Sequence, residues 1–582
     1  MMQVYGDSVR RETAAALLAR LRSRMDTADA SRGLARHSAL ATLLIEAGVL
    51  AQGIADAQFH AIGKDANSAA IERSMELVMA LARCCAESWG SELARHTALP
   101  RAELQACEAL GIDAPLELKQ PEGYAYYALY PESYFEAALH CRSARGRESA
   151  GAWQVIGLRS IGTSLAAMVA VGLGAGPPRT LRPVGHPFHR RIEADRVRDT
   201  DTLFAIVDEG PGLSGSSLTA AVRWLLDAGV PASRIHLFPG HGGAPGPQAD
   251  EETRRLWSLV PKWPADFANA SGLFEHRLSD WVSTQVGSLD APLQDIGNGA
   301  WRSLQPADRP MPPAHPWQER RKYLAPNAQG RWLVKFAGLG RHGEHAWERA
   351  QALGAAGFSP EPMALCHGYL VERWRHDMAP LPATLPDAMR SRLTAWIARY
   401  LAFRARHFAA PEGSGAPLEQ LHAMGRHNTT EALGEAAATA WDRWKPLLSG
   451  LEARVRRIET DNRMHAWEWL SGSDTFLKTD AVDHHASHNL IGCQDVAWDV
   501  VGACVEFALA PSEEQSLIEH LGAEGVVLDG ELLRCLRPCY LAFHLGHFQM
   551  AIDGCAPAEA SILKAHRERY TQGLKACLLD CR

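Results

Sequence analysis

Apolar positions along the chain follow three patterns in succession. The helical spacing of about 3.6 residues runs through residues 13–25, 39–55, 71–89 and 101–110 and predicts a helical N-terminal region. From about residue 120 to residue 290, short continuous apolar runs alternate with helical patterns, as a doubly wound parallel sheet requires. Beyond residue 316, strand patterns flank a helical segment.

These changes of pattern predict a multidomain α/β and α+β protein. The predicted parts are a helical N-terminal region (1–115), a domain with a doubly wound parallel sheet (116–300), a linker (301–316) and a C-terminal α+β domain (317–582). Five prolines within residues 305–316 mark the linker, because such a composition is stiff and extended. A chain of 582 residues is also too long for one hydrophobic core.

A loop that could bind phosphate follows the apolar run at residues 203–207. The run ends in Asp208 and Glu209, and a loop of glycines and serines then leads into a helical pattern. Glycines let the backbone approach a ligand closely, and the free N–H groups of a helix start form a cradle for phosphate. The two acids are placed to bind ribose hydroxyls or Mg²⁺.

A second loop of this kind lies upstream, at residues 155–166. It too follows a short apolar strand, and its turn carries Arg159 before a helix with apolar periodicity. The intervening residues 179–192 contain four arginines, two histidines and two prolines, a composition typical of a loop that closes over an anion or of a basic surface loop. Because ligands of such sheets bind beyond the carboxyl ends of the strands, we expect both loops at one edge.

The two loops, in this order, resemble those of type I phosphoribosyltransferases. The resemblance implies an enzyme that uses Mg²⁺ and displaces diphosphate from phosphoribosyl diphosphate (PRPP) with an acceptor that the sequence does not reveal. It implies that Asp208 and Glu209 bind the ribose, that Arg159 holds the diphosphate, and that Arg190 or Arg191 screens the developing charge. The other PRPP-binding positions that it implies are Ser160, Gly162, Thr163, Gly210, Gly212, Ser214, Gly215, Ser216 and Ser217. The loop departs from the family in being one residue longer and in holding Pro211.

The C-terminal domain has charged residues at the ends of its strands. Lys335 lies near the end of the strand at residues 331–336, the helix at residues 344–353 carries Glu344 and Glu348, and Glu372 lies in the next strand. Two further strands, at residues 463–470 and 475–480, are joined by a Ser-Gly-Ser-Asp turn and end at Asp480.

This order of elements resembles a bilobal protein-kinase-like fold, with the aminoglycoside phosphotransferase and choline kinase branch as the nearest match. The resemblance implies that Lys335 pairs with nucleotide phosphates, that Glu344 or Glu348 holds this lysine, and that Glu372 belongs to the nucleotide site. It further implies that Asp480 binds the Mg²⁺ of ATP, while Glu468 occupies the place of the usual metal-binding asparagine. Asp495 and Asp499 would be structural.

The C-terminal domain also departs from that family. No His-Gly-Asp or His-Arg-Asp precedes the hairpin, where only Asp461, Arg463 and His465 lie near the position of the base, and no full glycine-rich loop precedes Lys335. An altered kinase and a non-catalytic nucleotide-binding relic are therefore both consistent with the sequence. The cluster Asp480, Asp483, His484, His485 and His488 also fits a transition-metal site.

Composition narrows the class of protein. A net charge of −7, with 46% hydrophobic and 22% charged residues, is typical of a soluble globular protein and indicates neither a nucleic-acid nor a membrane partner. The 12 cysteines form no Cys-x-x-Cys pair, which favours reduced thiols in the cytoplasm over a zinc site.

We expect small-molecule substrates, namely PRPP, an acceptor and ATP; the oligomeric state stays open. The alternatives to an enzyme are a ligand sensor that binds PRPP or a nucleotide without turnover, and a structural scaffold.

Overall fold

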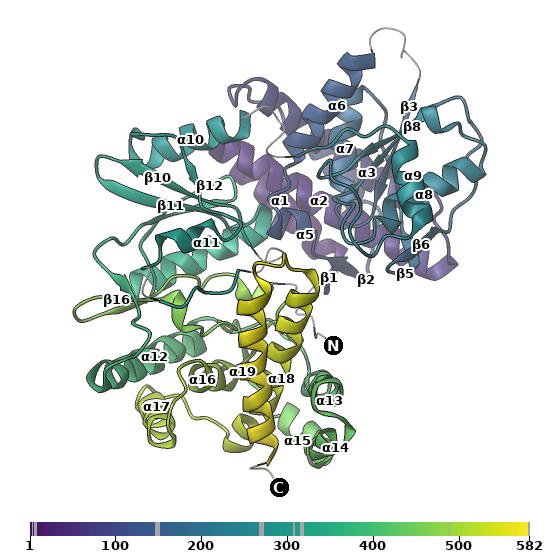
Figure 1. The fold of residues 1–582 in the computed structure, drawn as a ribbon. Helices are drawn as coiled ribbons and strands as arrows, with labels where there is room; N and C mark the ends of the chain where they lie inside the picture. The colour runs from purple at the N-terminus through teal and green to yellow at the C-terminus, as the bar shows by residue number, and fades with distance from the viewer. Residues whose placement is uncertain are drawn as a thin grey trace.

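The N-terminal helices form as their apolar spacing predicts. A computed structural model describes residues 1–2, 4, 9–145, 152–266, 273–306, 309–314, 319–487 and 489–579 (Figure 1). The first elements are β1 (Val9–Thr13), α1 (Ala14–Ala30), α2 (Gly33–Ile62), α3 (Ala69–Gly90), α4 (Arg101–Glu108) and β2 (Pro115–Lys119). Strands β1 and β2 pair in antiparallel fashion. Side chains of Thr13 and Ser68 cap α1 and α3 by accepting backbone N–H groups, which fixes where these helices start.

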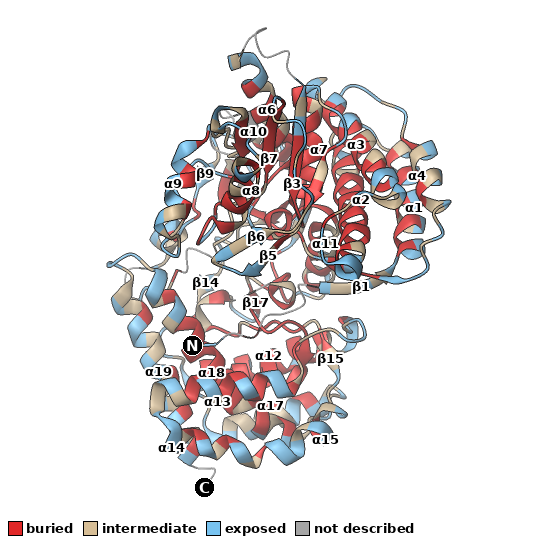
Figure 2. Cartoon of the chain, turned by 90° about the vertical axis from the view of Figure 1, so that its right-hand side faces the viewer, coloured by how far each residue is buried: buried red, intermediate tan, exposed pale blue. Residues whose placement is uncertain are grey.

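Helix α2 runs through the middle of the upper part of the molecule and is buried along most of its length (Figure 2). Within the described chain it is the one helix long and apolar enough to cross a membrane, and 89% of its apolar window is buried inside the protein. Packing in the core therefore accounts for its composition.

The middle of the chain forms a parallel sheet with helices on both faces, as predicted. Its strands run in the order β4-β3-β7-β8 and are all parallel. On β7, Phe204 and Ile206 face one apolar cluster with α8 and α9, while Ala205 and Val207 face another with α6 and α7. The elements are α5 (Glu122–Tyr126), α6 (Pro131–Arg145), β3 (Trp153–Leu158), α7 (Gly162–Leu173), β4 (Arg179–Leu181), β5 (Pro183–His186), β6 (His189–Ile192), β7 (Leu203–Val207), α8 (Ser216–Asp227), β8 (Ile235–Phe238) and α9 (Glu251–Leu259).

A second, antiparallel sheet follows, with strand order β12-β13-β11-β10-β9. Strand β9 lies before residue 300 yet pairs with β10, so the predicted boundary at residue 300 falls inside this unit. Of the predicted linker, residues 307–308 and 315–316 lie outside the described residues. The elements are α10 (Leu273–Val286), β9 (Gln294–Asp295), β10 (Lys322–Asn327), β11 (Gly330–Phe336), α11 (Gly340–Ala355), β12 (Pro362–Cys366) and β13 (Tyr369–Arg373).

The C-terminal part is mostly helical and lies below the antiparallel sheet in Figure 1. The predicted hairpin is present, but its first strand is shorter than predicted because Ala466–Glu468 forms a 3₁₀ turn. The elements are β14 (Ala379–Pro380), α12 (Asp387–His407), α13 (Leu418–Leu433), α14 (Glu435–Ala438), α15 (Leu448–Glu452), β15 (Arg457–Ile458), β16 (Trp469–Ser471), β17 (Phe476–Lys478), β18 (Gln494–Asp495), α16 (Val496–Glu506), α17 (Pro511–Ala523), α18 (Gly530–Gly554) and α19 (Ala560–Leu579).

The hydrophobic cores do not follow the predicted domains. One cluster contains Leu43 of α2, Val155 of β3 and Trp332 of β11 together, so the N-terminal helices and both sheets share a core. The C-terminal helices belong mainly to two other clusters. Helix α11 also packs directly against α2. The N-terminal region therefore joins the parallel sheet to the antiparallel sheet.

Candidate functional site

A cavity of about 410 Å³ lies between the antiparallel sheet and the C-terminal helices. Its polar wall brings together residues far apart in sequence, among them Lys335, Glu372, Arg463, Glu468 and Asp480. Its aromatic wall is made by Trp301, Trp374, Trp467 and Phe548. Four of the residues that the sequence assigns to the nucleotide and metal site, Lys335, Glu372, Glu468 and Asp480, thus border one cavity.

Lys335 is held by carboxylates. It comes from β11, its side chain is 9% exposed, and its Nζ forms an ion pair with Asp480 and lies 4.0 Å from Asp483 Oδ1. Burial lowers the pKa of Lys335, but the two carboxylates outweigh burial and raise this pKa above its ordinary value. The lysine is therefore charged and bound to acids that follow β17.

The predicted pairing of Lys335 with a glutamate of α11 is wrong. Glu344 forms an ion pair of 2.6 Å with Arg24 of α1, and Glu348 is exposed. The buried face of α11 instead carries His342 and Arg349. Since residues four apart share one face of a helix, Glu344 and Glu348 turn away from Lys335 together.

His484 links the two acids that the sequence places around the site. Its Nε2 lies 3.5 Å from Asp480 Oδ2, and its Nδ1 lies 3.2 Å from Asp461 Oδ1. Burial lowers the pKa of His484, but the neighbouring carboxylates raise it to about 9 overall. Lys335 and His484 lower the pKa of Asp480 well below its ordinary value against the effect of burial, so this carboxylate is ionised.

Lys478 is a residue of the candidate site that the sequence did not point to. Its side chain is 0% exposed, and its Nζ donates to Glu468 Oε2 at 2.7 Å and to the Asp480 carbonyl at 2.6 Å, with Asp461 Oδ1 at 3.5 Å. Lys478 comes two residues before Asp480, and alternate residues of a strand share a face. That spacing is the signal that could have placed an ammonium beside the predicted metal ligands.

Asp461 is fixed by the protein around it and is 0% exposed. Backbone N–H groups of Asp461 and Asn462 donate to the carboxylate of Asp499 at 2.7 and 2.9 Å, and the Tyr400 hydroxyl donates to Asp461 itself. Asp495 caps α16 by accepting from Ala497 N at 2.9 Å. The acid nearest the predicted position of the base is thus held in place but closed off from solvent.

Two sets of residues bring possible metal-binding atoms together, within 4.8 Å of one another. They are Asp461, Glu468 and His484, and Asp480, Asp483 and His484. In the first set, Glu468 already accepts from Lys478; in the second, two carboxylates offer the hard oxygen ligands that Mg²⁺ prefers. Of the histidine cluster in the sequence, His485 lies 3.7 Å from Glu459, and His488 lies outside the described residues.

The acids predicted to bind ribose lie at the carboxyl end of β7. Glu209 Oε2 accepts from Gly123 N at 2.9 Å, and Asp208 Oδ1 accepts from Glu209 N at 2.9 Å. Burial raises the pKa of Asp208 to about 7 and that of Glu209 to about 8. Glu209 is therefore largely protonated at neutral pH and tied to the backbone.

The serines of the predicted phosphate loop are bonded within the protein. Ser214 and Ser216 hydroxyls donate to the carbonyl of Pro187 at 3.3 and 2.7 Å, and Pro187 lies at the tip of the β5–β6 hairpin. The loop glycines Gly212 and Gly215 adopt φ of 57° and 66°, a conformation that favours glycine. The loop turns at its glycines as predicted, but the serine hydroxyls that were predicted to bind phosphate donate to a protein carbonyl instead.

Arg159 is an internal salt-bridge residue. It borders a cavity of about 240 Å³, but its side chain is 1% exposed, its Nε donates to Asp56 at 2.8 Å, and it also pairs with Asp65. Both acids come from the N-terminal region, which the sequence left without a role. The structure thus corrects the assignment of Arg159 to a diphosphate, since its guanidinium already binds two carboxylates.

The remaining PRPP positions lie nearby with contacts of their own. Gly162 and Thr163 open α7 and are buried, Ser160 is half-buried just before them, and Ser217 is half-buried in the first turn of α8. On the hairpin, Arg190 donates to the Gly185 carbonyl at 2.7 Å and Arg191 pairs with Glu193 at 2.6 Å. Gly210 lies three residues after the end of β7. Most of these residues therefore lie near the carboxyl ends of β3 and β7, as predicted.

Comparisons with known proteins give similarities of structure alone. No family model matches the chain, and no curated protein matches it. Choline kinase LicA from Streptococcus pneumoniae is 13% identical, with 52% of this chain and 99% of that chain covered and a TM-score of 0.36. Macrolide 2'-phosphotransferase MphH from Brachybacterium faecium is 14% identical, with 51% and 97% covered and a TM-score of 0.33.

A Plasmodium vivax ethanolamine kinase is 13% identical, with 63% of this chain and 95% of that chain covered and a TM-score of 0.32. These proteins are of the class that the C-terminal sequence resembles. The phosphoribosyltransferase resemblance gains no support from them. Because the identities and scores are low, the function proposed below rests on the residues of this chain.

Proposed function

We propose that the cleft beside Lys335 binds a nucleoside triphosphate with Mg²⁺ and transfers its terminal phosphoryl group to a small molecule. The observation that carries this proposal is the pair of Lys335 and Asp480 at the wall of a 410 Å³ cavity. Phosphoryl transfer needs a cation on the phosphates and a carboxylate on the metal, and little covalent chemistry from the protein.

Binding would exchange partners within this pair. The ammonium of Lys335 would move from Asp480 to a phosphate oxygen, and the freed carboxylate of Asp480, with Asp483, would hold the Mg²⁺. Glu372 lies on β13 beside Lys335, and burial raises its pKa to about 8 despite that lysine. A protonated Glu372 can donate a hydrogen bond to the nucleotide at neutral pH.

The transfer step is a displacement at phosphorus. A hydroxyl oxygen of the acceptor bonds to the γ-phosphorus, the bond from that phosphorus to the bridging oxygen breaks, and the nucleoside diphosphate leaves with Mg²⁺. The hydroxyl proton passes to a carboxylate, for which Glu468 borders the cavity, whereas Asp461 is buried and Asp480 would hold the Mg²⁺. The aromatic wall favours an acceptor with an apolar or cationic surface.

A second candidate function is nucleotide binding without turnover. The observation that favours it is Lys478, whose ammonium is buried between Asp461 and Glu468. A fixed ammonium neutralises carboxylates that an active kinase would use for the base and the metal. On this account the cleft senses the nucleotide and the protein passes no phosphoryl group.

Titration calorimetry with ATP and Mg²⁺, followed by assay of ADP release against a panel of small alcohols and amino alcohols, tests the proposal. Binding with turnover supports transfer, and binding without turnover supports the sensor. In both cases Lys335→Met should weaken binding by roughly tenfold to a hundredfold, whereas Glu348→Gln, a matched change of an exposed acid on α11, should leave it intact. Absence of ATP binding by the wild-type protein would contradict both.

A further inference from the structure

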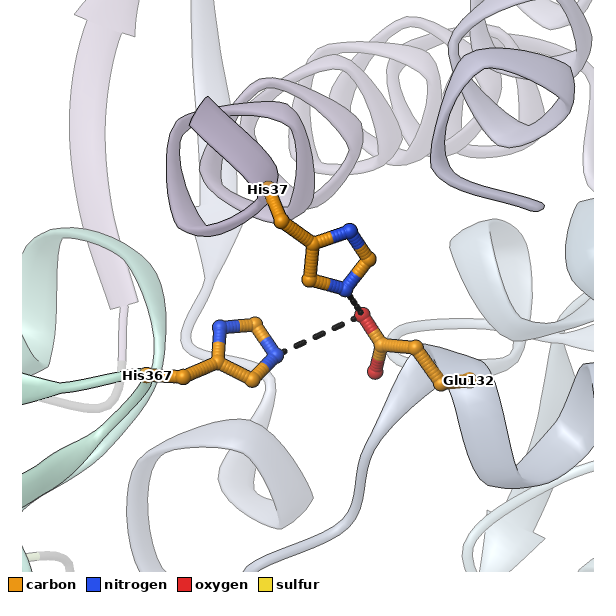
Figure 3. A group of neighbouring side chains, drawn as sticks. All are labelled: His37, Glu132 and His367. Atoms are coloured by element: carbon orange, nitrogen blue, oxygen red, sulfur yellow. Dashed lines mark ion pairs between the residues drawn. The ribbon is translucent and has the colours of Figure 1, made fainter. Parts of the chain in front are cut away.

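Three buried side chains from separate parts of the chain point at one spot. His37 comes from α2, Glu132 from the first turn of α6, and His367 from the turn between β12 and β13 (Figure 3). Each side chain is 0% exposed. One potential ligand atom of each lies within 4.8 Å of the other two.

The atoms that face this spot have no hydrogen-bond partner among the described residues. This holds for Nε2 of His37, Nε2 of His367 and both carboxylate oxygens of Glu132. Buried polar atoms left in this way cost free energy, and proteins keep few of them. Both Nε2 atoms lie within ion-pair distance of Glu132, but none of these contacts has hydrogen-bond geometry, so a bound ligand would satisfy these atoms better.

The other nitrogen of each imidazole is anchored. Nδ1 of His37 lies 3.0 Å from Ser88 Oγ, and Nδ1 of His367 lies 3.0 Å from Ser38 Oγ. Metal-binding histidines are oriented in this manner, with one ring nitrogen fixed by a hydrogen bond and the other presented to the ion. The anchoring explains why both Nε2 atoms converge on Glu132.

The distances suit coordination. Nε2 of His37 lies 2.9 Å and Nε2 of His367 lies 3.4 Å from the same oxygen of Glu132. Ligand atoms about 2.0–2.1 Å from a tetrahedral ion lie roughly 3.3 Å apart. The spacing thus matches a shared ion, while the direction of the atoms satisfies no hydrogen bond.

We propose that His37, Glu132 and His367 bind a divalent transition-metal ion, with Zn²⁺ as the expected ion. Two imidazole nitrogens and the two carboxylate oxygens supply four donor atoms, a set that suits Zn²⁺. Trp89 stacks on His37 at 5.6 Å between ring centroids, and Trp281 meets His367 edge-on at 5.4 Å. This aromatic shell excludes water from the ion.

The ion would be structural and would join two parts of the fold. It would tie α2 and α6 to the turn of the antiparallel sheet, so that the sheet bearing Lys335 is fixed to the N-terminal helices. His367 adopts φ of 45° and Gly368 φ of 91°, as a tight two-residue hairpin turn requires. Asparagine is the residue usually found at the first of these positions. A role as a metal ligand would explain why a histidine stands there instead.

Metal analysis of the full chain tests the site. The protein is stripped with a chelator and dialysed against Zn²⁺, and bound zinc is counted by mass spectrometry. We expect one ion per chain, lost in His37→Ala and in His367→Ala. His236→Ala is the control, because His236 is also buried but belongs to none of the sets of possible metal ligands among the described residues, and it should keep the zinc.

Two further measurements test the site even if the histidine variants fail to fold. Ser88→Ala keeps all three ligands but removes the partner of His37, and it should weaken zinc binding by about tenfold to a hundredfold. Anomalous diffraction from the wild-type protein should place the ion between the three side chains. The proposal is overturned if the wild type keeps no zinc, if both histidine variants keep it, or if the anomalous peak lies elsewhere.

Discussion

The carboxyl end of β7 and the cleft beside Lys335 were both predicted to bind phosphate, and they differ in what their polar groups contact. At β7 the hydroxyls of Ser214 and Ser216 bond to the hairpin carbonyl of Pro187. In the cleft, Lys335 and Asp480 bond to each other at the wall of a cavity. A strand-loop-helix pattern thus specifies the shape of a loop, whereas a binding site also needs polar groups that can exchange partners.

Arg159 gives the largest expected effect. Arg159→Met leaves the buried carboxylate of Asp65 without its guanidinium and leaves Asp56 with that of Arg182 alone. Breaking a buried pair in this way costs about 3–5 kcal/mol. Urea unfolding measures this loss. Lys64→Met is the matched control, because its ion pair with Asp195 is exposed and should change stability by less than about 1 kcal/mol. If Arg159→Met is as stable as wild type but loses PRPP binding, the diphosphate assignment is restored.

Lys335 comes next. Lys335→Met removes a charge-assisted contact to phosphate worth about 1.5–3 kcal/mol, so ATP·Mg²⁺ binding should weaken by roughly tenfold to a hundredfold. Calorimetry measures the affinity. Equal affinity in the variant and the wild type would place the nucleotide elsewhere.

The acids at β7 should make stability depend on pH. Burial raises the folded pKa of Glu209 to about 8, above its ordinary value, so the folded state binds a proton that the unfolded state releases at lower pH. Its contribution to stability is present below the unfolded pKa and is lost as pH rises through the folded pKa. The slope is at most about 1.4 kcal/mol per pH unit per group.

Glu209→Gln should flatten that dependence between about pH 5 and pH 8, as unfolding free energies at several pH values would reveal. Glu251→Gln, an exposed acid in the first turn of α9, serves as control. An unchanged slope in Glu209→Gln would show that this carboxyl is ionised in the folded protein.

The smallest expected effect is at Ser216. Ser216→Ala loses one hydrogen bond to the hairpin, which costs about 0.5–1.5 kcal/mol, and should speed proteolysis at the β5–β6 turn. Ser217→Ala, at the neighbouring half-buried position, is the control. A large loss of PRPP affinity in Ser216→Ala would contradict the internal role of this hydroxyl.

The local pattern of apolar and polar residues predicted much of the fold. Apolar spacing located α3 to within two residues, and the resemblance to a kinase-like fold assigned Lys335 and Asp480 to one site, where both border the same cavity. Ion-pair partners that are distant in the sequence could not be predicted from it. The acids that bind Arg159 come from about a hundred residues upstream. Whether a glutamate of α11 reaches Lys335 depends on how that helix is rotated about its axis. Lys478 escaped notice because a lysine in a strand is ordinarily solvated.

The most direct test of the central claim is a crystal structure of the protein with a non-hydrolysable ATP analogue and Mg²⁺. The account predicts the nucleotide in the cleft, with a phosphate oxygen on Lys335 Nζ in place of Asp480 and Mg²⁺ on that aspartate. A cleft left empty at saturating analogue, with Lys335 still bound to Asp480, would contradict it.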